Sequence, residues 1–104
     1  RAVLRSLRSH GRMWLYGAGA HTRWMLDTIP EARSQVSGIV DDHAQWQSVG
    51  GFIVGAPETV PAGSHVLISS DGAEDALWAR AEVLRRRGVH VHRIYEASVA
   101  PESL

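Results

Sequence analysis

The residues best suited to chemistry in this sequence form a glycine turn between an apolar strand and a helix. Glycine has no Cβ atom, so Gly17 and Gly19 let the backbone adopt special angles and allow an anion to approach closely. The helix that follows presents unpaired N–H groups and the positive end of its dipole at the same point. Together these features favour a bound phosphate. The candidate binding residues of the turn are Gly17, Ala18, Gly19, Ala20, His21 and Thr22.

One residue of the turn departs from the dinucleotide-binding pattern. Thr22 stands where a third glycine normally lets the helix pack close to the strand, so we expect the helix to be loosened or shifted. His21 is suited to donate to a phosphate or to act as a general base, although a plain helix-start residue is the commoner interpretation. A tight turn that needs glycine for its geometry alone is the alternative for the whole segment.

Two acids follow the second apolar segment at the distance expected of a ribose-binding carboxylate. Asp41 lies 41 − 19 = 22 residues after Gly19, close to the offset of roughly 20 residues in NAD sites. An acid there accepts from a ribose hydroxyl and repels a 2′-phosphate, which favours NAD or a plain nucleotide over NADP. A solvated acidic turn is the alternative. Asp41, Asp42 and His43 are adjacent and such residues rarely converge on one ion, so we expect no metal cofactor.

Further polar residues follow the later strands. Ser69 and Ser70 end an apolar segment, where a hydroxyl can bond a phosphate or sugar, or Ser70 can cap the next turn. Neither lies in a Gly-x-Ser-x-Gly elbow, so we expect no nucleophile. His90 and His92 share one face of the last strand, and two ligands are too few for zinc without a third. Trp46 is a candidate to cover a ligand.

Alternating apolar segments and helical patterns position these residues and predict an α/β domain. The expected strands are 13–16, 36–40, 52–54, 65–69 and 89–95, and the expected main helices are 20–29 and 71–87, the latter with a capping box of Asp71 and Glu74. Too few residues follow the acids for a crossover helix, so the second crossover is abbreviated. We expect a single Rossmann-like three-layer domain with a parallel sheet of about five strands in the order 3-2-1-4-5.

That strand order places the candidate residues at one crevice. Its switch point lies between the first and fourth strands, so the glycine turn and the two serines should both border the crevice there. The two acids follow the end of the neighbouring second strand. We expect an amphipathic helix over 1–10, the Rossmann-like domain over 11–96 and a tail over 97–104. The chain begins at Arg rather than Met, so we expect it to be part of a longer polypeptide.

Composition excludes several classes of function. The 104 residues suit one domain, and 11 basic and 11 acidic residues cancel, which argues against nucleic-acid or anionic-membrane partners. All basic residues are Arg, and the absence of Lys excludes a P-loop, a Schiff base and a Tyr/Lys dyad in these residues. There is no Cys, and no apolar run approaches the ~18 residues of a membrane span. We expect a cytoplasmic protein.

Four short motifs carry a resemblance to a known group of proteins: Trp14-Leu-Tyr-Gly-Ala-Gly-Ala-His21, Gly38-Ile-Val-Asp-Asp42, Gly50-Gly-Phe-Ile-Val-Gly-Ala-Pro57 and Val66-Leu-Ile-Ser-Ser70. Over about residues 11–96 the chain resembles the Rossmann-like domains of bacterial surface-sugar enzymes, which precede the β-helix of sugar acyltransferases and open nucleotide-sugar dehydratases of polysaccharide biosynthesis. The resemblance implies a nucleotide-sugar held by Gly17, Gly19, His21, Asp41 and Asp42. It implies no catalytic residue, because the acyltransferase catalytic residues lie mainly in the β-helix.

Three interpretations of function follow from these patterns. The first is a binding module for a nucleotide or nucleotide-sugar, not catalytic alone, within a larger carbohydrate-modifying protein. The second is the NAD-binding part of an oxidoreductase or epimerase whose substrate-binding part lies elsewhere. The third is a degenerate Rossmann domain that binds no ligand and mediates protein assembly through exposed Trp side chains and a bare edge strand.

Overall fold

The centre of the sheet is β1 (Met13–Tyr16), a strand that is apolar on both faces. In the computed structural model, which describes residues 11–70 and 72–93, β1 lies between β2 (Val36–Val40) and β5 (His65–Ile68). The edge strand β6 (His90–His92) pairs with β5. All three pairings are parallel and give the order β2-β1-β5-β6. A parallel sheet with apolar side chains on both faces requires cover on both.

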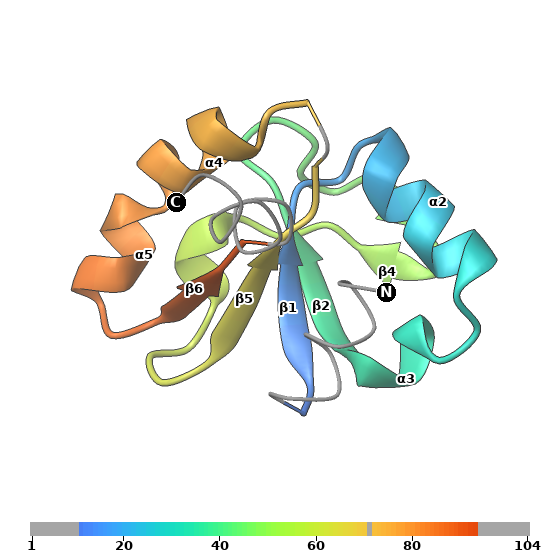
Figure 1. The fold of residues 1–104 in the computed structure, drawn as a ribbon, viewed down its shortest axis with the longest axis horizontal. Helices are drawn as coiled ribbons and strands as arrows, with labels where there is room; N and C mark the ends of the chain where they lie inside the picture. Colours follow the sequence, from blue (N-terminus) through green and yellow to red (C-terminus); the bar gives the residue numbers. More distant parts are fainter. Residues whose placement is uncertain (1–10, 71, 94–104) are drawn as a thin grey trace, which may run out of the picture.

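Helices provide that cover, with one pair on each side of the sheet (Figure 1). They are α2 (Ala20–Thr28), α3 (Ala32–Gln35), α4 (Glu74–Arg80) and α5 (Glu82–Arg86). Side chains alternate across β1, so Met13 and Leu15 pack in one buried cluster with Met25 of α2. Tyr16 packs in the other cluster with Leu84 of α5. The fold is therefore α/β with three layers, as the sequence predicts, and it is compatible with a Rossmann-like arrangement.

The predicted five-stranded sheet of order 3-2-1-4-5 is wrong at its outer position, because the sheet has four strands. Residues 52–54 were expected at that edge. Instead β4 (Phe52–Ile53) forms an antiparallel hairpin with β3 (Ser48–Val49), turning through two glycines with positive φ. Among the described residues, one parallel β-bridge pairs this region with β2, and it joins Val40 and Gly55. The chain between β2 and β4 is too short for a crossover helix, so it folds back on itself.

The predicted helix 71–87 is also divided. α4 and α5 meet at Ala81, and Gly88, with φ +87°, follows the end of α5 close to the predicted boundary at 87. Asp71 of the expected capping box lies outside the described residues, and the Glu74 carboxylate is 3.3 Å from the guanidinium of Arg93. Ser70 stabilises the turn before α4, since its hydroxyl accepts the N–H of Ala73 at 2.9 Å.

Two short segments connect the rest. A 3₁₀ turn, η1 (Pro57–Thr59), begins with proline and leads toward β5. The predicted helix over 1–10, the tail over 97–104 and residues 94–95 of the last predicted strand lie outside the described residues. No helix within the described ranges is both long and apolar enough to cross a membrane.

The buried face of β1 yields a first prediction. Leu15 is fully buried in the central strand, so Leu15→Ala should lower the free energy of unfolding by about 2–5 kcal/mol through lost burial and a residual cavity. Urea unfolding measures the change. Ile53, 62% exposed on β4, is the control, and Ile53→Ala should stay within about 0.5 kcal/mol of the parent. Equal effects of the two substitutions would contradict the assignment of the core.

Candidate functional site

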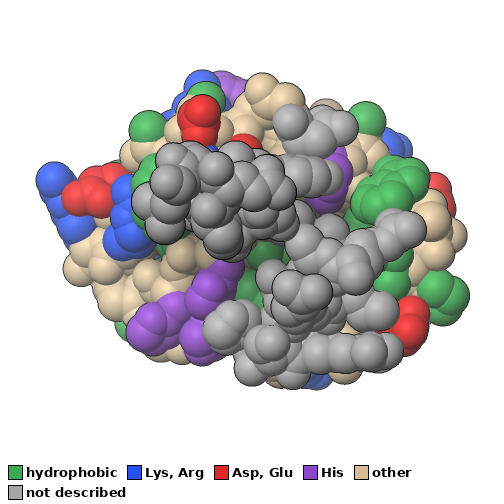
Figure 2. Space-filling view, in the orientation of Figure 1, with side chains coloured by type: hydrophobic (Ala, Val, Ile, Leu, Met, Phe, Trp, Pro, Cys, Tyr) green, Lys and Arg blue, Asp and Glu red, His purple; other side chains and the backbone are tan. Residues whose placement is uncertain are grey.

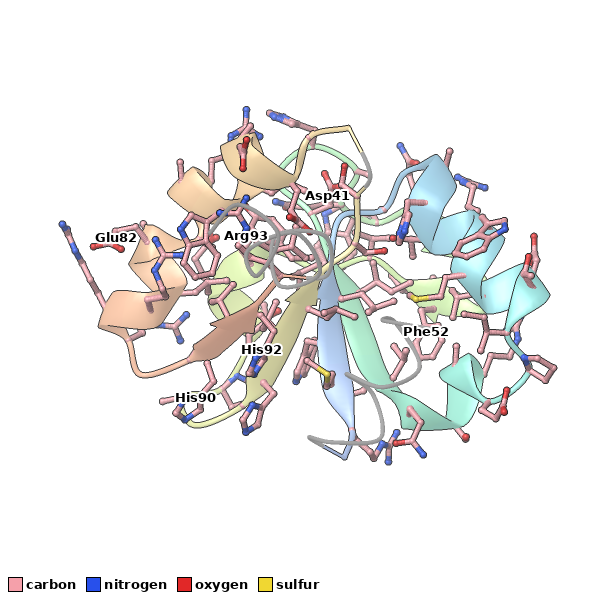
Figure 3. All side chains as sticks on the ribbon, viewed as in Figure 1. Asp41, Phe52, Glu82, His90, His92 and Arg93 are labelled. Carbon is pink, nitrogen blue, oxygen red and sulfur yellow. The ribbon has the colours of Figure 1, made fainter. Side chains whose placement is uncertain are left out.

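A cavity of about 250 Å³ opens at the carboxyl ends of β1, β2 and β5. Its walls come from the turn after β1, the loop after β2, the segment after β5 and one face of α4. Asp41 marks this end of the sheet in Figure 3. The lining residues are Gly17, Ala18, Gly19, Ala20, His21, Asp41, Asp42, His43, Ser69, Ser70, Ala73, Leu77 and Arg80. All of the sequence-predicted site residues except Thr22 are among them, and this is the expected switch-point crevice.

The structure requires glycine at one of the two glycine positions of the turn and not at the other. Gly17 has φ +122°, and a Cβ atom there would lie 2.9 Å from the backbone oxygen of Ser69. Both its angles and the close approach of β5 therefore demand glycine. Gly19 has an ordinary φ of −90°, and a Cβ atom there would meet no atom of residues 11–70 and 72–93 within 4 Å. The packing of these residues explains Gly17 and does not explain Gly19.

Thr22 lies beneath the cavity and is fully buried. Its hydroxyl contacts the carbonyl oxygen of Gly17 and lies 2.7 Å from the hydroxyl of Ser69, which in turn is 3.0 Å from Nδ1 of His21. The expectation that Thr22 loosens the helix misses this function. In place of close glycine packing, Thr22 ties the first turn of α2 to both the glycine turn and the end of β5.

This chain of contacts fixes the proton positions. Thr22 has one hydroxyl proton, and its contact with the Gly17 carbonyl is a hydrogen bond only if Thr22 donates there. Ser69 must then donate to Thr22, and Nδ1–H of His21 must donate to Ser69. With these donors, Nδ1 of His21 carries a proton. His21 is positioned at the cavity wall by a buried network, and its rotation is restricted.

Asp41 connects the glycine turn to the loop after β2. Its Oδ2 accepts the N–H of Ala18 at 2.8 Å, and its Oδ1 accepts the N–H groups of His43 at 2.7 Å and Ala44 at 3.0 Å. Burial raises the pKa of a carboxyl, but the three backbone donors outweigh burial and hold the pKa of Asp41 below its ordinary value. Asp41 thus has a structural role that the sequence interpretation did not include. Its predicted contact with a ribose stays a prediction.

Asp42 and Arg80 form a second polar group across the cavity. Asp42 accepts the hydroxyl of the buried Tyr16 at 2.5 Å, and burial together with this bond raises the pKa of Tyr16 well above its usual value. From α4, Nη1 of Arg80 lies 3.4 Å from Oδ2 of Asp42 and 3.4 Å from Nε2 of His43. The predicted site lacked four of the lining residues: His43, Ala73, Leu77 and Arg80. Of these, Arg80 comes from farthest along the chain. Only the antiparallel placement of α4 over the crevice brings it there, and no local motif signals it.

Two other sequence predictions lie away from the cavity. Trp46 does not line it, and its side chain is 83% exposed on a residue with φ +73°. His90 and His92 share a face with His65, whose Nδ1 is 2.8 Å from Nε2 of His92 and whose ring stacks on that of His90. Figure 2 shows histidine side chains gathered over β5 and β6. Within residues 11–70 and 72–93, no group of three or more His, Cys, Asp or Glu is placed to hold a metal ion.

The geometry of Gly17 gives a second prediction. Gly17→Ala should destabilise the protein by about 1–3 kcal/mol or more, because alanine is strained at φ +122° and its Cβ meets the backbone of β5. Gly19→Ala should leave stability within about 0.5 kcal/mol of the parent, since its Cβ meets open space. Thermal and urea unfolding compare the pair. A Gly17 variant as stable as the Gly19 variant would refute the described turn.

The carboxylate of Asp41 gives a third prediction. Asp41→Asn should cost about 1–3 kcal/mol at pH 7, because an amide cannot replace an acceptor of three N–H groups. The folded-state pKa is lowered, so this stabilisation is complete above the ordinary carboxyl pKa of about 4 and is lost as pH falls through the folded value. Urea unfolding at pH 7, 5 and 3 should therefore show the gap between parent and variant closing at acid pH.

An exposed carboxylate on α2 controls for a general charge effect. Asp27→Asn should change stability by no more than about 0.5 kcal/mol across the same pH range. A gap for Asp41→Asn that is as wide at pH 3 as at pH 7 would mean that the ionised carboxylate does not hold the turn.

Comparison of the chain with protein families, with curated proteins and with solved structures finds no match. The function is therefore argued from the cavity and its residues.

Proposed function

We propose that the cavity binds the phosphate-bearing part of a small molecule, with a nucleotide or nucleotide-sugar as the ligand class. The observation that carries the proposal is Gly19. It lines the cavity, its own backbone angles do not require glycine, and no atom of the described residues fills the space that a side chain would take. A glycine that packing does not need, at the start of a helix, suits a backbone that a ligand approaches closely.

The first turn of α2 supports an anionic ligand. N–H groups in the first turn of a helix have no partner within the helix, and no side chain of the described residues caps α2. The N–H of Ala18 already binds Asp41, so the donors aimed at the ligand are those from Gly19 onward. Asp41 repels an anion less than its position suggests, because three N–H dipoles already compensate its charge.

The size of the cavity bears on which ligand is held. A volume of about 250 Å³ is below the ~300–1,000 Å³ of pockets that enclose a whole drug-sized molecule. It suits a phosphate with part of a sugar, while the remainder of a nucleotide extends beyond the cavity. A full dinucleotide would extend further still. We therefore favour the nucleotide or nucleotide-sugar over NAD, in a Rossmann-like module of a larger carbohydrate-modifying protein such as the surface-sugar enzymes that the motifs resemble.

No reaction is part of the proposal. The lining carboxylates and hydroxyls hold the protein together: Asp41 binds three backbone donors, and Ser69 binds Thr22 and His21. Ser70 binds the N–H of Ala73. His21 is positioned at the wall by its bond to Ser69, so it is suited to contact the ligand. A binding module that acts with further domains of its polypeptide fits this set of groups best.

Ligand screening with a matched glycine pair tests the proposal. Thermal unfolding is followed with UDP-glucose, AMP, NAD and NADP, and a specific ligand at 100 times its Kd should stabilise the parent by about 2.7 kcal/mol. Gly19→Ala should abolish that shift while leaving the unliganded protein as stable as the parent. Gly72→Ala is the control, because Gly72 also has open space around its Cβ position but does not line the cavity. No shift with any of the four compounds would refute ligand binding and leave the assembly interpretation.

A further inference from the structure

We infer that Arg80 is the residue that makes this cavity select an anionic ligand, and that it does so by exchanging its contact with Asp42 for the ligand's phosphate. The inference rests on the proposed function and adds a specificity-determining residue to it. It predicts that the phosphate is required for binding, and that Asp42 competes with the ligand for the same guanidinium.

The present contacts of Arg80 are weak. Its Nη1 is 3.4 Å from both Asp42 and His43, well beyond the usual N–H···O distance near 2.9 Å. Its side chain is 51% exposed. Exposed ion pairs contribute only about 0–1 kcal/mol to stability. Moving the guanidinium away from Asp42 therefore costs little, and the fold does not depend on that pair.

Asp42 keeps its position when Arg80 moves, because a second group holds it. The hydroxyl of Tyr16 donates to Asp42 at 2.5 Å, and Tyr16 is only 2% exposed in the core of the sheet. The cavity wall formed by the loop after β2 is therefore preserved during the exchange. Asp42 is fixed and Arg80 is adaptable, which is the arrangement that an exchange of partners requires.

The charges around the cavity explain why Arg80 should decide which ligand binds. Asp41 and Asp42 both line the cavity, and Arg80 is the one Arg among its described lining residues. An anion that entered without engaging Arg80 would meet two carboxylates with no guanidinium to offset them. The planar guanidinium has five donors and can bind two phosphate oxygens at once. Its present contact with Asp42 is long and uses only one carboxylate oxygen. A neutral nucleoside gains nothing from this residue.

Two substitutions test whether Arg80 exchanges Asp42 for the ligand's phosphate or merely lies near the ligand. Arg80→Gln removes the cation and should weaken binding of UDP and of inorganic pyrophosphate at least ~10-fold, while leaving any binding of uridine unchanged. Asp42→Asn removes the competing charge, yet its amide oxygen can still accept from Tyr16, so it should strengthen UDP and pyrophosphate binding several-fold. Asp42→Asn should strengthen binding less in the Arg80→Gln background than in the parent, because there it relieves only the direct repulsion between Asp42 and the anion and no longer frees Arg80. Isothermal titration calorimetry measures each affinity.

Arg86→Gln is the matched control. Arg86 is 77% exposed on α5 and does not line the cavity, so its loss should leave the affinities unchanged. Urea unfolding checks that each variant is as stable as the parent. If Arg80→Gln binds UDP as tightly as the parent does, the inference is overturned and the proposed function stays intact. Weaker binding after Asp42→Asn would also overturn it, because Asp42 would then be a ligand contact. Parent protein that binds none of the probes, in this titration and in the four-compound screen, would overturn both.

Discussion

The carboxylate of Asp41 holds together the two segments on which the cavity depends. The turn after β1 and the loop after β2 leave the sheet at neighbouring positions with N–H groups that the ladder does not use. Asp41 accepts from both, through Ala18 on one side and His43 and Ala44 on the other. Without an acceptor there, the buried N–H of Ala18 and the half-buried N–H of Ala44 would lose their partner, and the unmet donors would together cost roughly 1–3 kcal/mol. The shape of the site thus follows from the need of these backbone N–H groups for a hydrogen-bond acceptor.

A second connection fixes the third strand end. Thr22 and Ser69 join α2 and the glycine turn to the end of β5 through buried hydroxyls, and Gly17 allows the two backbones to approach closely. The two connections share no residue but meet at the same turn. Together they connect the carboxyl ends of β1, β2 and β5 into one rim. Connections already formed without a ligand reduce the ordering that ligand binding would require.

The sequence predicts the cavity well because its signals are local. The apolar segment before Gly17, the helix after Gly19 and the acids after Val40 each follow from neighbouring residues, and parallel pairing brings them together. What the sequence could not predict depends on distant partners. The hairpin at Gly50 replaces an edge strand because of chain length, and Arg80 reaches the cavity only through the packing of α4. The structural role of Thr22 could not be predicted because Thr22 replaces the third glycine of the dinucleotide-binding pattern. It joins the helix to the strand ends through its hydroxyl and not through close packing.

The contacts of the polar groups support the proposed binding function. A catalytic group needs a proton or lone pair available to the substrate, in suitable geometry. Asp41 directs its oxygens to the backbone, Ser69 directs its hydroxyl to Thr22, and Tyr16 is held protonated by burial and by Asp42. Recognition is then left to the N–H groups at the start of α2, to His21 at the wall and to the weakly held Arg80. These groups can neutralise and orient an anion, and a site built from them gains specificity from charge and shape.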